Sequence, residues 1–337
     1  NKFGKKWTYS KKLSLESEFD ILTNIFNKEN YDEVIEKGKL VLSRFNKSHL
    51  IHNIIGSAYL RIRNFNKAKY YFERSVKLNS NFPQGYFNLG YTYYELEELK
   101  LSKKYCLKAL ELKPNYSFPY NTLGAIYQDM SQHQKALECF KKAIEIDSNS
   151  VKPKYNLHLH YAYHGNFQEA WRYFEFRFEA INTHNELNKI SGLRWNLGMS
   201  NNVYIWAEQG LGDFILYSRF LNDLTSVTDS ITVLIDRKIK QLLERSFPKV
   251  NFTTKVDLSK VDYHAPIGDL AKFYINNFND VKIRSEAYIN VDKSRTQKIK
   301  QLLPKGKKIC GISWISKNES LGINKSTTLE DMKELLL

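Results

Sequence analysis

A glycine-containing segment, WAEQGLGDFIL at 206–216, is the part of the sequence best suited to hold a ligand. It joins a predicted strand at 203–209 to a predicted helix at 214–224. A glycine turn at the carboxyl end of a strand places backbone N–H groups and a helix N-terminus in the crevice where α/β proteins bind ligands. Two glycines also suit any tight turn. Gly210 and Gly212 are one residue short of a dinucleotide fingerprint, so NAD binding is not predicted.

Two histidines have a spacing that can seat a metal ion. His160 and His164 lie one turn apart on a predicted helix. No third ligand is evident in the sequence, so the pair is interpreted as structural or exposed. The three cysteines are scattered and match neither a disulfide framework nor a zinc pattern. We therefore predict no metal site.

An internal repeat of 34 residues supplies the elements of the first half of the chain. At this period the sequence has Gly56, Gly90, Gly124 and His158. Three positions later come Tyr59, Tyr93, Tyr127 and Tyr161. Twelve positions after the first set come Ala68, Ser102, Ala136 and Ala170, and four beyond those come Phe72, Cys106, Phe140 and Phe174. This recurrence predicts two antiparallel helices per block, with small residues where the helix axes approach and rings beside them.

The spacing and residue types resemble the tetratricopeptide repeat (TPR) family closely. The resemblance implies an α-solenoid whose stacked repeats bury one continuous core. We expect a tail at 1–14 and then an array at 15–180. The expected repeats are 15–48, 49–82, 83–116, 117–150 and 151–180. The first of them keeps the phase without the small residues, as a degenerate repeat or an N-terminal cap would.

In TPR proteins the first helices of successive repeats line a concave groove. The positions expected to point into it here are Asn53, Arg61, Gln84, Phe87, Tyr91, Tyr94, Asn121, Gln128, Tyr155 and Tyr163. Aromatic rings among amides suit an extended segment of a partner protein, but the groove could equally be only hydrated surface. Asn88 and Asn156 resemble the asparagine ladder of O-GlcNAc transferase-type arrays, although Ile54 and Thr122 interrupt the series.

The pattern changes after residue 180. A polar, irregular stretch at 181–202 is the predicted linker. Strand patterns at 203–209, 230–236 and 250–256 then alternate with helix patterns at 214–224 and 237–247, and a loop-rich stretch leads to a helix at 294–303 and a strand at 307–314. This alternation predicts a mostly parallel sheet with covering helices, a Rossmann-like unit at 203–303. The expected fold class is therefore α + α/β, a TPR solenoid followed by a parallel-sheet domain.

Five segments of the chain carry a second resemblance. They are YFEFRF at 173–178, LRWNLG at 193–198, IWAEQGLGDFILYSRFL at 205–221, DYHAPIGDLA at 262–271 and GISWISKNESLGINKSTTLEDMKELL at 311–336. In this order they resemble bacterial TPR proteins whose C-terminal half is similar to a GT-B glycosyltransferase of the heptosyltransferase type (glycosyltransferase family 9-like). The resemblance implies an acceptor lobe at 203–303 and the start of a nucleotide-sugar donor lobe at 304–337.

Specific roles also follow from this resemblance. In heptosyltransferase-like enzymes an aspartate after the glycine turn is the general base, which implies that role for Asp213. A helix N-terminus at a cleft keeps a carboxylate ionised and accessible, although Asp213 could simply cap the helix. The residues implied to bind substrate are Glu208, Gln209, Gly210, Gly212, Ser316, Lys317, Asn318, Lys325 and Ser326. The last five match a loop for the donor's phosphates, since cations and hydroxyls suit a diphosphate; Lys325 could equally be an ordinary surface lysine.

The expected donor lobe is incomplete within this sequence. One strand and part of a helix cannot bury a core, so we expect this chain by itself not to transfer sugar. No Asp-x-Asp pair occurs, which agrees with a metal-free GT-B scheme needing no cofactor beyond the nucleotide-sugar co-substrate.

Composition limits the remaining classes. With 337 residues, 42% hydrophobic and 26% charged, the chain is typical of a soluble protein with more than one folding unit. No apolar run approaches the roughly 20 residues that cross a bilayer, and we expect a cytoplasmic protein. The net charge of +15 comes from lysines spread along the chain, so a nucleic-acid partner ranks last. Two hypotheses stay open, a glycosyltransferase whose groove selects the acceptor and a protein-binding scaffold with a degenerate transferase-like domain.

Overall fold

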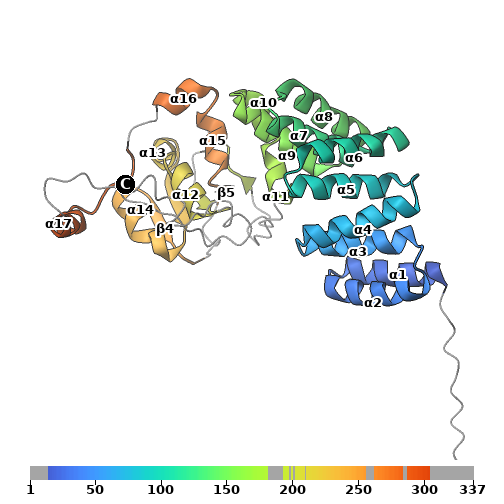
Figure 1. Ribbon diagram of the computed structural model, residues 1–337. Coiled ribbons are helices and arrows are strands. Elements are labelled where there is room, and N and C mark those ends of the chain that lie inside the picture. The colour runs from blue at the N-terminus through green and yellow to red at the C-terminus, as the bar shows by residue number, and fades with distance from the viewer. Residues whose placement is uncertain are drawn as a thin grey trace, which may run out of the picture.

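A helical array and a parallel sheet make up the described part of the chain (Figure 1). The computed structural model describes residues 14–180, 193–196, 199, 202–208, 210–255, 262–283 and 287–303. Residues 1–13 of the expected tail, most of the expected linker and the strand predicted at 307–314 lie outside these residues. The first helices of the pairs are α1 (Leu15–Asn27), α3 (His49–Arg61), α5 (Pro83–Glu95), α7 (Ser117–Asp129) and α9 (Val151–Tyr163). The second helices are α2 (Tyr31–Arg44), α4 (Phe65–Leu78), α6 (Leu99–Leu112), α8 (His133–Ile146) and α10 (Phe167–Arg172), followed by η1 (Phe174–Phe176) and α11 (Arg177–Ala180).

Each turn between the two helices of a pair has the same backbone conformation. One residue adopts a left-handed φ of 57° to 72° in the turns at Glu29, Arg63, Glu97, Ser131 and Gly165, again 34 residues apart. The N–H of the next residue then bonds to a carbonyl in the last turn of the first helix, as Asn64 N–H does to Tyr59 O at 2.9 Å. This Schellman-type closure satisfies carbonyls that the helix end would otherwise leave unpaired.

Within a pair, the small residues set how closely the helices approach. A Cβ at Gly56 would lie 2.8 Å from the ring of Phe72, and one at Gly90 would lie 2.8 Å from Sγ of Cys106. These partners are the positions that the 34-residue pattern places sixteen residues later. In the last pair His158 replaces glycine, and its Nδ1 lies 3.0 Å from the carbonyl oxygen of Ala170. The His158 ring also lies 4.8 Å from the ring of Phe174, so a polar contact is added to the ring packing there.

The second unit is a five-stranded parallel sheet with the order β1-β5-β2-β3-β4. Its strands are β1 (Leu193–Arg194), β2 (Asn202–Trp206), β3 (Ser230–Leu234), β4 (Asn251–Thr253) and β5 (Tyr263–Pro266). Its helices are α12 (Leu211–Ser218), α13 (Leu221–Leu224), η3 (Arg237–Ile239), α14 (Lys240–Ser246), α15 (Asp269–Tyr274), α16 (Phe278–Ile283) and α17 (Lys293–Leu302). The central strand β2 is buried from Val203 to Trp206, as expected for a strand covered on both faces.

The structure differs from the sequence prediction on both sides of β2. The expected linker contains β1, and the stretch interpreted as loop-rich contains β5, α15 and α16. β5 pairs with both β1 and β2, so it completes the sheet that the other strands begin. A four-residue strand ending in Pro266 has too few alternating positions to register as a strand pattern.

The last helix pair of the array is shared with the sheet unit. Phe167 and Trp171 of α10 pack against the core of that unit. The Trp171 indole N–H donates to the carbonyl of Ile275 at 2.7 Å, and the rings of Phe167 and Phe278 lie 5.4 Å apart. Figure 1 shows α15 and α16 beside α10, at the end of the array. The array and the sheet unit therefore pack against each other and bury a common surface.

We predict that Gly56→Val lowers the free energy of unfolding by about 1–3 kcal/mol, because the new side chain must displace the Phe72 ring. Gly212→Val is the matched control, since no atom lies within 4 Å of a Cβ at Gly212, and it should change stability by about 0.5 kcal/mol or less. Urea unfolding followed by circular dichroism measures both. Equal effects of the two substitutions would contradict the close-approach role of Gly56.

Candidate functional site

Two asparagine pairs connect first helices of neighbouring repeats. Nδ2 of Asn88 donates to Oδ1 of Asn53 at 3.0 Å, joining α5 to α3. Nδ2 of Asn156 donates to Oδ1 of Asn121 at 2.8 Å, joining α9 to α7. Among the described residues, no hydrogen bond occupies Nδ2 of Asn53 or Oδ1 of Asn88. Each pair thus fixes two amides while keeping a donor and an acceptor for another molecule.

Three adjoining cavities follow these pairs along the inner face of the array. The largest, of about 560 Å³, is lined by Phe26, Ser57, Leu60, Arg61, Arg63, Phe65, Phe87, Asn88, Tyr91, Glu95, Phe118, Asn121, Thr122 and Lys152. The second, of about 240 Å³, is lined by Tyr91, Tyr94, Asn121, Thr122, Ala125, Lys152, Tyr155, Asn156 and Ala180. The third, of about 330 Å³, is lined by Ser117, Phe118, Asn121, Ser150, Val151, Lys152, Pro153, Glu179 and Ala180. Asn121 and Lys152 belong to all three, so they form one groove, which we call the inner groove.

An aromatic cluster lies in the middle of the inner groove. The Phe87 ring lies 5.5 Å from Tyr116, 5.7 Å from Phe118 and 6.3 Å from Tyr91. Phe118 is 52% exposed. Its open face offers an apolar contact between the two asparagine pairs.

The structure brings most of the predicted groove residues together. Arg61, Phe87, Tyr91, Tyr94, Asn121 and Tyr155 line the cavities, and Asn53 bonds to one of the lining asparagines. Gln84 and Tyr163 are exposed and line none of the three, and Gln128 is turned to His160.

Sequence reasoning left several lining residues out of the groove prediction, among them Arg63, Phe118 and Lys152. Arg63 lies in a turn, and Phe118 and Lys152 are the second residues of α7 and α9, the repeat position at which the prediction named Gln84 alone. Asn88 and Asn156 were recognised by their ladder-like position. Their partners Asn53 and Asn121 lie 35 residues earlier, one position before the equivalent residues of the preceding repeats, which are Ile54 and Thr122. The hydrogen-bonded pairs therefore form although those equivalent positions carry no asparagine.

The two spaced histidines belong to a cluster with a third. Nδ1 of His160 lies 2.8 Å from Oε1 of Gln128, and its ring lies 4.7 Å from His164 and 6.5 Å from His133. Burial, with the neighbouring histidines and Lys141, lowers the pKa of His160 to about 4. His160 is therefore neutral at pH 7 and packs between α7 and α8. The described residues contain no group of His, Cys, Asp or Glu arranged to hold a metal ion.

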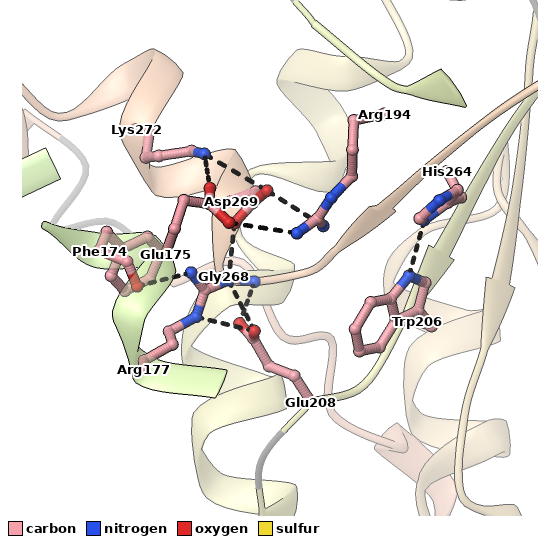
Figure 2. Close-up of polar contacts among 10 residues, drawn as sticks. All are labelled: Phe174, Glu175, Arg177, Arg194, Trp206, Glu208, His264, Gly268, Asp269 and Lys272. Carbon is pink, nitrogen blue, oxygen red and sulfur yellow. Dashed lines mark hydrogen bonds and ion pairs between the residues drawn. The ribbon is translucent and has the colours of Figure 1, made fainter. Parts of the chain in front are cut away.

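At the other predicted site, a buried ion cluster joins the array to the sheet (Figure 2). Arg177 of α11 donates from Nε to Oε2 of Glu208 at 2.9 Å and from one terminal nitrogen to Oδ1 of Asp269 at 2.6 Å. Its other terminal nitrogen donates to the Phe174 carbonyl at 3.0 Å. The Arg177 and Glu208 side chains are each 2% exposed. The guanidinium thus binds two carboxylates from different elements.

Neighbouring groups complete this ion cluster. The backbone N–H of Gly268 donates to Oε1 of Glu208 at 3.0 Å, and a Cβ at Gly268 would collide with that oxygen. Lys272 lies 3.4 Å from Asp269 and 2.7 Å from Glu175. Burial raises the pKa of Glu208, while the contact with Arg177 opposes the shift. Asp269 has further cations beside it, so Arg177 is the main compensation for the Glu208 charge.

Aromatic rings enclose the guanidinium. The Arg177 guanidinium carbon lies 3.6 Å from the Phe174 ring centre and 4.0 Å from the Phe178 ring centre. The YFEFRF segment therefore folds around its own arginine and presents that arginine to the sheet. Arginine suits this place because its planar group can stack and hydrogen-bond at once. The structure places Glu208, implied by the resemblance to bind substrate, in this contact between elements.

Asp213 lies apart from the ion cluster. It is exposed in the first turn of α12, whose N-cap is Gly210, and Gly212 lies beside it in the same turn. Burial raises the pKa of the groove residue Tyr155; Arg177 opposes this shift and the Asp213 carboxylate adds to it. Gln209 and the predicted phosphate loop of Ser316, Lys317, Asn318, Lys325 and Ser326 lie outside the described residues.

The family matches lie within the array. Family models for the tetratricopeptide repeat match residues 51–82, 83–116 and 118–150. Protein FlbA of Caulobacter vibrioides is 28% identical over a segment covering 31% of this chain and 21% of FlbA, so the chain spans about a fifth of this curated relative. None of the helices in the described part of the chain has the length and apolar character of a membrane span.

Solved structures of repeat proteins each match about half of this chain. MamA is 25% identical with a TM-score of 0.41, covering 50% of this chain and 97% of MamA. TTC0263, a thermophilic TPR protein of Thermus thermophilus, is 16% identical with a TM-score of 0.46, covering 52% and 96%. YrrB, described as a TPR protein with an unusual peptide-binding site, is 19% identical with a TM-score of 0.38, covering 50% and 86%. The family matches make the helix pairs over residues 51–150 tetratricopeptide repeats.

We predict that Arg177→Met destabilises the protein by about 3–5 kcal/mol, because it leaves the Glu208 carboxylate buried without its cation. Arg194→Met removes a half-exposed arginine near Asp269 and should cost about 1 kcal/mol or less. Chemical denaturation monitored by tryptophan fluorescence measures the difference. Adding Glu208→Gln and Asp269→Asn to Arg177→Met should recover part of the loss; no recovery would mean that the buried charges are not its cause.

Proposed function

We propose that this protein binds an extended peptide segment of a partner protein in the inner groove. The observation that carries the proposal is the position of the two hydrogen-bonded asparagine pairs on the wall of one continuous groove. Each pair keeps a free donor and a free acceptor at a fixed spacing, which matches the C=O and N–H of a peptide unit.

The dimensions of the inner groove favour a chain over a compact small molecule. It extends across α3, α5, α7 and α9. Packed helices lie about 8–10 Å apart, so three such steps span roughly 25–30 Å. An extended peptide covers that length with about eight or nine residues. A ligand of this size can reach both asparagine pairs and the aromatic cluster between them.

The test is selection of binders from a displayed library of random decapeptides, followed by fluorescence anisotropy with a selected peptide. We predict that Asn88→Ala combined with Asn121→Ala weakens binding by about tenfold or more, because hydrogen bonds to the peptide backbone are lost. Asn115→Ala with Asn149→Ala is the matched control, since both asparagines are exposed and line none of the three cavities. Selected peptides that bind both double variants equally would place the binding surface elsewhere.

A second candidate function, sugar transfer by the natural protein that contains this chain, is supported by one arrangement. The glycine turn follows the central strand of a parallel sheet and carries an exposed carboxylate, Asp213. A general base needs such access to a hydroxyl. A peptide in the inner groove would then be the acceptor. The resemblance to GT-B enzymes supports this candidate, whereas the family matches cover the repeats alone.

For this candidate we predict that Asp213→Asn, made in the full natural protein, lowers the rate of sugar transfer by at least about 100-fold. Asp229→Asn is the control, because Asp229 is exposed directly before β3, at the end of the parallel strands opposite to the glycine turn. Transfer from radiolabelled nucleotide sugars to the selected peptide measures both. Unchanged turnover in Asp213→Asn would remove Asp213 from the chemistry, and peptide binding without any turnover would leave the scaffold function alone.

A further inference from the structure

The charges of the largest cavity point to the chemistry of its ligand. Arg61, Arg63 and Lys152 line this cavity, whereas Glu95 is its one acidic residue. All three cations are exposed at the surface. The ion pairs of the described residues include none of the three, so no carboxylate of that part of the chain lies within 4 Å of them.

The acidic residue of the cavity, Glu95, lies one helical turn after Tyr91, which lines the same cavity. Burial, together with the Glu95 carboxylate, raises the pKa of Tyr91. Glu179 is acidic as well, and it lines the neighbouring cavity together with Lys152. Arg61 and Arg63 line only the largest cavity, and no carboxylate of the described residues forms an ion pair with either of them. An incoming carboxylate would gain from both arginines.

Apolar surface is available in the same cavity. Phe87 and Phe118 line it together with the three cations, and Phe118 has an open face. A ligand that satisfies this cavity has carboxylates for the arginines and an apolar side chain for the rings. Nucleic acid would bring phosphates, but a concave wall with asparagine pairs suits a peptide backbone better.

We propose that the segment bound in the inner groove is acidic, with Asp or Glu side chains against Arg61 and Arg63 and an apolar side chain on Phe118. This inference rests on the proposed peptide-binding function and specifies the partner. It concerns local charge, because the net charge of +15 would attract any acidic molecule weakly to the whole surface.

The repeat itself supplies a charge reversal that the fold tolerates. Arg61 and Arg63 correspond, 34 residues later, to Glu95 and Glu97. Arg63 and Glu97 even share the left-handed φ, at 58° and 61°. Arg61→Glu with Arg63→Glu therefore places in one repeat the residue types that the next repeat already has. The matched control is Lys77→Glu with Lys100→Glu, which makes the same change of net charge at exposed lysines of α4 and α6 outside the cavities.

The experiment compares the random-decapeptide selection and the anisotropy titrations for the unmodified protein, both charge variants and Phe118→Ala. We expect selected peptides to be enriched in Asp and Glu around an apolar residue. Their affinity should fall at least about tenfold in Arg61→Glu/Arg63→Glu and weaken from 50 to 500 mM NaCl, while Lys77→Glu/Lys100→Glu changes it less than about threefold. Circular dichroism checks that each variant is folded, and Arg61→Gln/Arg63→Gln replaces the reversal should it unfold.

The outcomes separate the two proposals. One outcome is that selected peptides lose affinity in Asn88→Ala/Asn121→Ala but are neutral or basic, or bind equally to both charge variants. This outcome overturns the acidic partner and leaves the inner groove as the binding site. Failure to select any peptide that depends on the asparagines overturns both proposals. The proposed partner is also overturned if a nucleic acid binds at Arg61 and Arg63 more tightly than any selected peptide.

Discussion

Close approach of paired helices at one small residue per repeat is the constraint on which the rest of this structure depends. Gly56 and Gly90 have no room for a side chain, because a ring or a sulfur occupies the space that a Cβ would need. The same contact recurs every 34 residues, so successive pairs stack with the same offset. That regular offset brings Asn53 beside Asn88 and Asn121 beside Asn156, and so generates the inner groove.

The end of the array has a different task. Its last pair lacks the small residue and carries His158, and its second helix is short. Trp171 and Arg177 then bind the sheet unit through a buried indole bond and a buried guanidinium. A buried arginine between two carboxylates adds little net stability, since the cost of desolvating the charges offsets much of their attraction. Its main effect is to fix the position of the end of the array relative to the sheet unit.

The sequence predicted the array well because its period is set by packing that every repeat must satisfy. The close approach at Gly90 follows directly from the residue types. The sheet was harder, because β5 is four residues long and its pairing with β2 is non-local. Glu208 illustrates the same limit at the site: its motif indicates a ligand, but its partner Arg177 lies 31 residues away, and no local pattern connects the two. The asparagine pairs were predictable in part: the repeat identified Asn88 and Asn156, but their partners lie 35 residues earlier, one residue more than the repeat length.

Binding in the inner groove is the central claim, and side-chain amide NMR tests it most directly. Asn53, Asn88, Asn121 and Asn156 each carry an NH₂ group whose resonances respond to a new hydrogen bond. Titration with a selected peptide should shift these amides together, with one common affinity, while the amides of Asn115 and Asn149 stay unchanged. Shifts confined to Asn115, Asn149 or the sheet unit would contradict the account and place the partner on another surface.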